Sequence, residues 1–134
     1  MRGEAKSTIN EKGRMNFPAK FQETFGNNFV VAKGLRARCV QIYKTEEWEE
    51  FVKNLKENHP KTKADAVLRF RGAENAELDN NNRFFIPSHL REYAELKKDV
   101  VVCGLEGEVE IWNREALVEN QNADISALVD EMGL

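Results

Sequence analysis

The sequence predicts an α+β domain assembled from two similar halves, each made of short strands and short helices. The first observation is an internal repeat: residues 9–18 recur as residues 78–87, and every aligned pair is separated by the same 69 positions. The second is that both copies end in a proline followed by a helical pattern. Because strands this short cannot bury a face alone, the two halves are expected to share one core.

Each copy of the repeat begins with a tight hairpin. In the first copy Asn10 can close the turn onto its own backbone, and Gly13 takes a positive φ without steric cost. Asn82 replaces this glycine in the second copy, and asparagine is the next best residue at positive φ. Pro18 and Pro87 then suit the first position of a helix, where a missing N–H costs nothing.

The similarity between the halves continues beyond the prolines. Residues 29–35 match residues 99–105 after a one-residue slip, and residues 40–43 match residues 109–112. All four segments are rich in the β-branched and aromatic residues that favour strands. Each half is therefore expected to run as hairpin, short helix, strand, turn, strand and helix. The last helix is expected to start at residues 45–48 in the first half and at residues 113–116 in the second.

Apolar side chains at helical spacing predict three helices after residue 44, the first of which is the last element of the first half. Thr45 can cap the first, which is expected to end near Pro60. The second follows directly, with an apolar side over residues 64–70, and joins the two halves. The third is a C-terminal helix with Asp124 as a possible cap, and its apolar stripe is expected to pack on the core of its own chain. That stripe consists of Ile125, Leu128, Val129 and Met132.

The length of 134 residues suits one domain, and no linker rich in Pro, Gly or Ser separates the halves. We divide residues 1–134 into a first half, 1–70, with a helical insert at 45–70, and a second half, 71–134. A charge at Ile86 or Ile111 is expected to unfold the protein. The predicted core consists of Phe17, Phe21, Val31, Ile42, Ile86, Leu90, Val101 and Ile111.

The net charge of −3 conceals a strong asymmetry. Residues 1–44 carry nine Lys or Arg against three Glu, a balance of +6, whereas residues 99–134 carry one Arg against nine acids, a balance of −8. Such a division indicates a basic end and an acidic end with different partners, unless the fold mixes them into a neutral surface. No apolar run is long enough for a membrane span and the start has no signal region, so we expect a cytoplasmic protein.

The sequence lacks the motifs of catalysis. It has no phosphate loop, no nucleophile elbow and no acidic cluster with metal-ligand spacing. Cys39 and Cys103 stand alone on predicted strands and are expected to be reduced, structural thiols. We therefore expect no enzyme activity, no cofactor, no metal and no small-molecule substrate.

The candidate site is the pair of hairpin tips, since each tip is followed by an arginine. If the halves pair about a pseudo-twofold axis, the tips lie side by side and their cations merge into one basic patch. Arginine forks onto a phosphate or onto guanine, and a two-stranded ribbon fits the major groove of DNA. The candidate DNA-binding residues are Asn10, Lys12, Gly13, Arg14, Asp79 and Arg83, with Arg2, Lys6 and Lys20 as further phosphate contacts.

The combination of these residues is similar to that of a known protein family. With its tight turn, Arg, apolar strand and Pro used twice, the chain resembles the MraZ proteins, which belong to the swapped-hairpin AbrB superfamily. The resemblance covers nearly the whole chain and rests on the combination of several motifs. They are Lys12-Gly13-Arg14 through Phe21, Glu46-Glu47-Trp48, Glu77-Leu78-Asp79, Arg83 to Pro87, Leu90-Arg91-Glu92-Tyr93 and Val109-Glu110-Ile111-Trp112.

The resemblance implies a tandem, pseudo-twofold, swapped-hairpin domain, or double-split β-barrel, with flanking helices. It implies a cytoplasmic, nucleoid-associated repressor of the division and cell-wall gene cluster that encodes it. It also implies a ring-shaped homo-oligomer that binds double-stranded DNA at tandem repeats in its own promoter, where several copies multiply a weak contact.

The chain departs from the family pattern at both tips. The family marks each half with Asp-x-x-x-Arg, which is intact from Asp79 to Arg83, whereas Asn10 precedes Arg14 in the first half. Asn10 can still accept hydrogen bonds in the turn but cannot pair with Arg14, so this tip is expected to be slightly more positive. The second loop, residues 80–82, has neither Gly nor Lys. The first half is therefore expected to do most of the DNA binding.

Two other functions remain open. One is an AbrB-like antitoxin whose acidic C-terminal segment neutralises a protein toxin, although two folded repeats without a long disordered tail argue against it. The other is a ring scaffold for which DNA binding is not essential. A tip at residues 12–14 that proves dispensable for activity in the cell would favour the scaffold.

Overall fold

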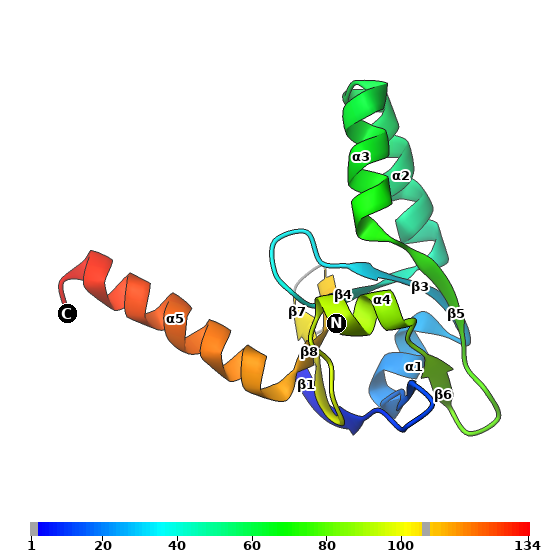
Figure 1. Cartoon of the computed structure of the whole chain (residues 1–134), viewed down its shortest axis with the longest axis horizontal. Coiled ribbons are helices and arrows are strands. Elements are labelled where there is room, and N and C mark those ends of the chain that lie inside the picture. Colours follow the sequence, from blue (N-terminus) through cyan, green and yellow to red (C-terminus); the bar gives the residue numbers. More distant parts are fainter. Residues whose placement is uncertain (1–2, 106–107) are drawn as a thin grey trace.

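The computed structural model describes residues 3–105 and 108–134, which form a mixed α+β fold (Figure 1). The strands are β1 (Gly3–Thr8), β2 (Arg14–Asn16), β3 (Asn28–Lys33), β4 (Val40–Lys44), β5 (Glu74–Glu77), β6 (Arg83–Phe85), β7 (Asp99–Leu105) and β8 (Glu108–Asn113). The helices are α1 (Ala19–Phe25), α2 (Thr45–Asn58), α3 (Lys61–Arg71), α4 (Ser88–Tyr93) and α5 (Arg114–Met132). The predicted α+β class is therefore confirmed.

The strands form one antiparallel sheet of six, in the order β1-β7-β8-β4-β3-β5, and a separate ribbon in which β2 pairs with β6. If each strand is replaced by its counterpart in the other half (β1 by β5, β3 by β7, β4 by β8, and the reverse), the same order is obtained, read from the opposite edge of the sheet. In the ribbon Arg14 lies opposite Phe85, and Arg83 lies opposite Asn16, which is the same pair with the two copies of the repeat exchanged. Strand pairing thus follows the symmetry of the repeat, and it brings the two tips together.

The sheet register corrects the one-residue slip expected between residues 29–35 and 99–105. Thr8 lies opposite Asp99, and its repeat counterpart Glu77 lies opposite Asn28. Asn28 and Asp99 are therefore equivalent positions, so the second half has slipped by two positions relative to the repeat, not by one. A slip of one position would have turned each strand's core side chains to the opposite face. The two extra positions lie in the loop between α4 and β7.

Three helices start one residue away from the predicted positions. Pro18 and Pro87 have extended ψ angles of 138° and 148° and precede the helices as caps, so α1 and α4 begin at the next residue. Thr45 is likewise the first residue of α2, and the capping position belongs to Lys44. The Lys44 N–H donates to Glu47 Oε1 at 3.1 Å, which satisfies one end group without a threonine side chain.

All eight predicted core residues are buried. Seven belong to the main cluster between the sheet, the ribbon, α1 and α4, whereas Val101 faces a smaller cluster with Trp112 and Leu117. Rings join the two halves in the main cluster: the centroid of Phe17 lies 5.3 Å from that of Phe84 in an edge-to-face contact. A shared core was the expectation for strands of this length.

The C-terminal helix begins at residues 113–116, as the repeat predicts, but the cap expected at Asp124 and the expected packing of the stripe are wrong. Asn113 caps α5, since its side chain accepts hydrogen bonds from the N–H groups of Glu115 and Ala116, and Asp124 lies inside the helix. Figure 1 shows α5 extending away from the sheet, while α2 and α3 stand side by side elsewhere. Ile125 is 60% exposed, so the stripe does not pack on its own chain. Helix α5 is continuous from Arg114 to Met132 and is buried only at Leu117, so the stripe lies on the part of the helix that extends beyond the sheet.

Candidate nucleic-acid interface

The two hairpin tips have the same backbone hydrogen bonds although their first residues differ. Asn10 Oδ1 accepts from the N–H groups of Lys12 and Arg14, each at 3.0 Å. Asp79 Oδ1 accepts in the same way, at 2.8 and 3.0 Å, from the residues two and four positions further on. An amide and a carboxylate therefore hold equivalent turns, as expected for side chains that bond to the backbone nearby.

A positive φ is present in both tips, at 80° for Gly13 and 58° for Asn82. Gly13 is also enclosed: a Cβ built on it would lie 3.0 Å from the Phe85 ring and 3.1 Å from the Arg91 guanidinium carbon. Glycine is therefore required at the first tip for two reasons, the backbone conformation and the lack of space.

Asp79 contacts the arginines of both tips. Its Oδ2 lies 3.1 Å from Arg14 Nη1 and 3.7 Å from Arg83 Nε. The pKa of Asp79 is lowered, first by the hydrogen bond from the Arg83 N–H, then by that from Asn81 and by the two guanidinium groups. Arg14 therefore has a carboxylate partner from the second half, although Asn10 supplies none. Its side chain remains 43% exposed and can still meet a ligand.

The two tips share a groove of about 900 Å³. Its lining includes two acids, Glu11 and Asp79. The basic residues that line it are Lys12, Arg14, Arg83, Arg91, Lys97 and Lys98. We call this surface the basic groove; its six cations and two acids give it a net charge of +4.

Three of these cations were missed by the sequence argument. Lys97 and Lys98 lie in the loop that is two positions longer in the second half, and the Ile9 N–H donates to the Lys98 carbonyl at 2.9 Å. This contact brings the loop beside the first tip. Arg91 extends from α4, where its Nε donates to the Ile86 carbonyl at 2.8 Å. The signal that could have identified Lys97 and Lys98 is the insertion of two residues before β7, relative to the first half of the repeat.

A second groove, along β5 and the second tip, is acidic. This groove of about 720 Å³ is lined by Glu74, Glu77 and Asp79, and Arg14 is the single cation that lines it within the described part of the chain. Asn80 contributes a neutral amide. The two grooves share Arg14 and Asp79 but have net charges of opposite sign.

The remaining predicted residues lie elsewhere. Lys20 Nζ donates to the Glu4 carbonyl at 3.0 Å and lies over the Phe21 ring, near the start of β1 rather than at the tip. Lys6 is exposed on β1 and does not line the basic groove. Arg2 falls outside the described residues. The structure therefore brings together the six tip residues of the prediction but not the two outlying lysines.

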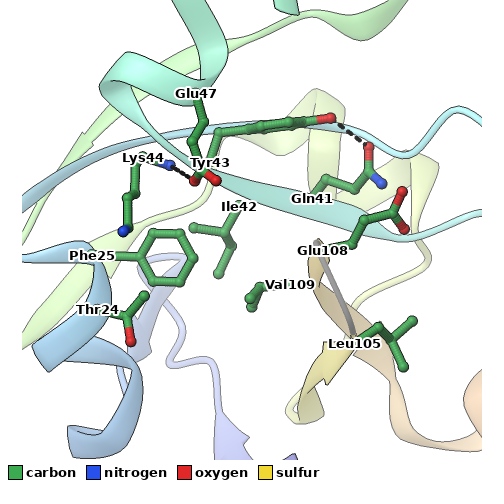
Figure 2. Close-up of a pocket in the computed structure, with 10 residues that line it drawn as sticks. All are labelled: Thr24, Phe25, Gln41, Ile42, Tyr43, Lys44, Glu47, Leu105, Glu108 and Val109. Carbon is green, nitrogen blue, oxygen red and sulfur yellow. Dashed lines mark hydrogen bonds between the residues drawn. The ribbon is translucent and has the colours of Figure 1, made fainter. Parts of the chain in front are cut away.

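A smaller pocket of about 190 Å³ lies between the end of α1, β4 and the ends of β7 and β8 (Figure 2). Its apolar side chains include Phe25, Ile42 and Val109, and its charged ones are Lys44 with two glutamates. This mixture does not suit a polyanion. Within residues 3–105 and 108–134 no cluster of His, Cys, Asp and Glu is placed to hold a metal ion, and no helix has the length and apolar character to cross a membrane.

Comparisons of this chain with family models and with known proteins identify the same family. The family model described as "MraZ protein, putative antitoxin-like" matches twice, at residues 1–70 and 69–127. A protein named Transcriptional regulator MraZ from Caldanaerobacter subterraneus subsp. tengcongensis is 43% identical over 129 residues, covering 92% of this chain and 89% of the relative. Its namesake from Desulforamulus reducens is 40% identical over 134 residues, covering 97% and 92%.

A third relative of the same name, from Moorella thermoacetica, is 45% identical over 116 residues, which cover 84% of this chain and 80% of the relative. The two matches to the family model together span almost all of the chain, including both tips. The chain therefore belongs to the MraZ family.

Proposed function

We propose that this protein is a transcriptional regulator that binds double-stranded DNA at tandem repeats in its own promoter. In this proposal it represses the gene cluster for cell division and the cell wall that encodes it. The relatives' name, Transcriptional regulator MraZ, supports the regulatory role, and the basic groove supports the DNA contact. The observation that carries the proposal is the convergence of six cations from both halves on one groove at the hairpin tips.

In this proposal the ribbon of β2 and β6 enters the major groove of DNA. Arg14 is exposed, and Asp79 fixes its orientation at 3.1 Å, so its guanidinium can fork onto guanine or onto a phosphate. Lys12, Lys97 and Lys98 contact phosphates, which add affinity without reading sequence. The first tip does most of the binding, because the groove along β5 and the second tip is acidic.

The proposal includes an assembly. Residues 1–70 and 71–134 form the two halves of a swapped-hairpin, AbrB-like domain, which the pairing of β2 with β6 supports. Several copies form a ring, so that one weak groove per copy is multiplied on repeated DNA sites. The exposed apolar side chains of α5 support an interaction between copies. The protein acts in the cytoplasm, associated with the nucleoid, and has no catalytic role.

The test is fluorescence anisotropy of the purified protein on its own upstream DNA and on a scrambled duplex, over a series of salt concentrations. Wild type is compared with Arg14→Ala and with Lys53→Ala, which removes an exposed cation on α2 far along the sequence from the tips. We expect preference for the protein's own DNA, a steep salt dependence, and loss of most binding in Arg14→Ala alone.

Other results would change the proposal. If neither duplex binds at low salt, DNA binding is wrong, and the antitoxin and scaffold functions become the ones to test. If both variants bind like wild type, the interface lies elsewhere on the protein.

A further inference from the structure

Arg71, at the end of α3, is fully buried although it carries a charge. Its Nε donates to the Lys33 carbonyl at 2.7 Å, and its Nη2 donates to Gln41 Oε1 at 2.6 Å and to the Tyr43 hydroxyl at 2.8 Å. The same hydroxyl donates to Gln41 Oε1 at 3.1 Å (Figure 2). The guanidinium also lies over three rings, at 4.9 to 5.3 Å from the centroids of Tyr43, Trp48 and Phe51.

The internal repeat predicts an equivalent arginine-binding site in the other half of the chain. Each of the five residues that contact Arg71 has a counterpart in the second half. The sheet register gives the counterpart on β7, and the offset of the repeat gives those on β8 and α5. These counterparts are Gly104, Glu110, Trp112, Leu117 and Asn120. All five line one pocket of about 330 Å³ between β7, β8 and the first turns of α5.

The second pocket has the chemistry to bind a cation. Glu110 takes the place of Gln41; it is only 8% exposed, and its Oε1 accepts from Trp112 Nε1 at 2.9 Å. Glu4 and Asp124 also line the pocket, and no cation does so in the part of the chain that the structure describes. A carboxylate binds a guanidinium more strongly than an amide does, and a buried carboxylate is costly without a partner.

The position of the pocket indicates its occupant. Gly3 lines it and has a φ of 110°, and its repeat counterpart Gly72, which follows Arg71, also has a positive φ. The residue before Gly3 is Arg2, which is the repeat counterpart of Arg71 and falls outside the described residues. We propose that this pocket is a guanidinium-binding site for the side chain of Arg2, with Glu110 as its carboxylate partner.

This contact ties the start of β1 to β8 and to the base of α5. In this proposal Arg2 binds the pocket, whereas the sequence pattern predicts a phosphate contact for it. The site acts on the folded chain whether or not DNA is bound, so its test is independent of the proposed function.

The experiment is thermal unfolding of the full chain without DNA, with three variants that each replace one arginine by methionine. Arg2→Met tests the site, Arg71→Met is the reference for a buried guanidinium, and Arg69→Met is the matched control on an exposed arginine of α3. We expect Arg2→Met to lower the Tm by about 5 °C or more and Arg69→Met to leave it unchanged. An Arg2→Met variant that melts like Arg69→Met would overturn the proposal.

A second pair of measurements tests the partner and the ligand class. The loss of Tm caused by Arg2→Met should fall by at least half in a Glu110→Met background, because the charge and the acceptor oxygen are then both absent, whereas a glutamine there would reproduce the Gln41 acceptor of Arg71. Millimolar ethylguanidinium should raise the Tm of Arg2→Met and should not raise that of Arg2→Met combined with Glu110→Met. Equal losses in both backgrounds, or no response to ethylguanidinium, would show that Arg2 acts somewhere other than this pocket.

Discussion

Arg14 and Asp79 are 65 residues apart in the chain, yet their side chains form an ion pair of 3.1 Å between the two hairpin tips. The same carboxylate lies 3.7 Å from Arg83, so one acid from the second half orients the arginines of both. Since Asn10 holds the first turn without a charge, the tips together have two arginines and one of the two aspartates that the family pattern would supply. This arrangement leaves Arg14 positioned but exposed.

Asp79→Asn should weaken the fold in a pH-dependent manner. The pKa of Asp79 is lowered in the folded protein, chiefly by the Arg83 N–H, so its charge stabilises the fold above the ordinary carboxyl pKa of about 4. This contribution is lost as the pH falls through the lowered folded value. We expect the variant to be less stable than wild type at pH 7 and the difference to shrink on acidification.

Urea unfolding of both proteins at a series of pH values measures this difference. The turn itself should survive in Asp79→Asn, because Asn10 already holds the equivalent turn. A gap between the two midpoints that stays constant from pH 7 into the acid range would contradict the role given to the Asp79 charge.

Gly13→Ala should be more damaging than a matched glycine substitution elsewhere. Gly13 has a φ of 80° and no room for a Cβ beside Phe85, whereas Gly133 has a left-handed φ of 73° and nothing within 4 Å of its Cβ position. We expect Gly133→Ala to cost at most about 1 kcal/mol for the backbone alone and Gly13→Ala roughly 2–3 kcal/mol, because the change at the tip adds a clash. The midpoints of urea unfolding measure both costs. Equal costs would show that the tip accommodates a Cβ at residue 13 without strain.

Lys97→Ala combined with Lys98→Ala should reduce the salt dependence of DNA binding. Each phosphate contact contributes about 0.9 to the slope of log K against log salt, so the double variant should lower the slope by about 1 to 2. Lys53→Ala, on the exposed face of α2, is the control. An unchanged slope in the double variant would place the loop between α4 and β7 outside the DNA interface.

Ile111→Asp should unfold the protein, whereas Ile125→Asp should not. Ile111 is completely buried, and an unpaired carboxylate there costs several kcal/mol, on the order of the whole stability of a domain. Ile125 is 60% exposed on α5, so a charge there should change the stability of the monomer by only about 0.5 kcal/mol. Circular dichroism melts distinguish the two.

A soluble Ile111→Asp variant with a cooperative melt would refute the placement of the core. Size-exclusion chromatography of Ile125→Asp addresses the assembly as well: a smaller oligomer with an intact fold would show that the exposed stripe joins copies of the chain.

Much of the fold could be predicted because the repeat and the local patterns agree. The turn at residues 10–13, the positive φ of Asn82 and the buried face that includes Phe17 and Ile86 each depend on neighbours within a few residues. The repeat also predicted the helix start at residues 113–116, where Asn113 is the cap. The cap at Lys44 was less accessible, because it depends on backbone geometry at a single residue.

The sequence by itself determined the α+β class, the tight tips and the identity of the buried residues, because hydrophobic spacing and turn chemistry act locally. Only the tertiary structure decided that Asp79 pairs with Arg14, that Lys97 and Lys98 lie beside the first tip, and that α5 leaves the sheet with its apolar stripe exposed. Those outcomes follow from strand register and from the length of one loop. They depend on contacts between distant segments, which no local pattern records.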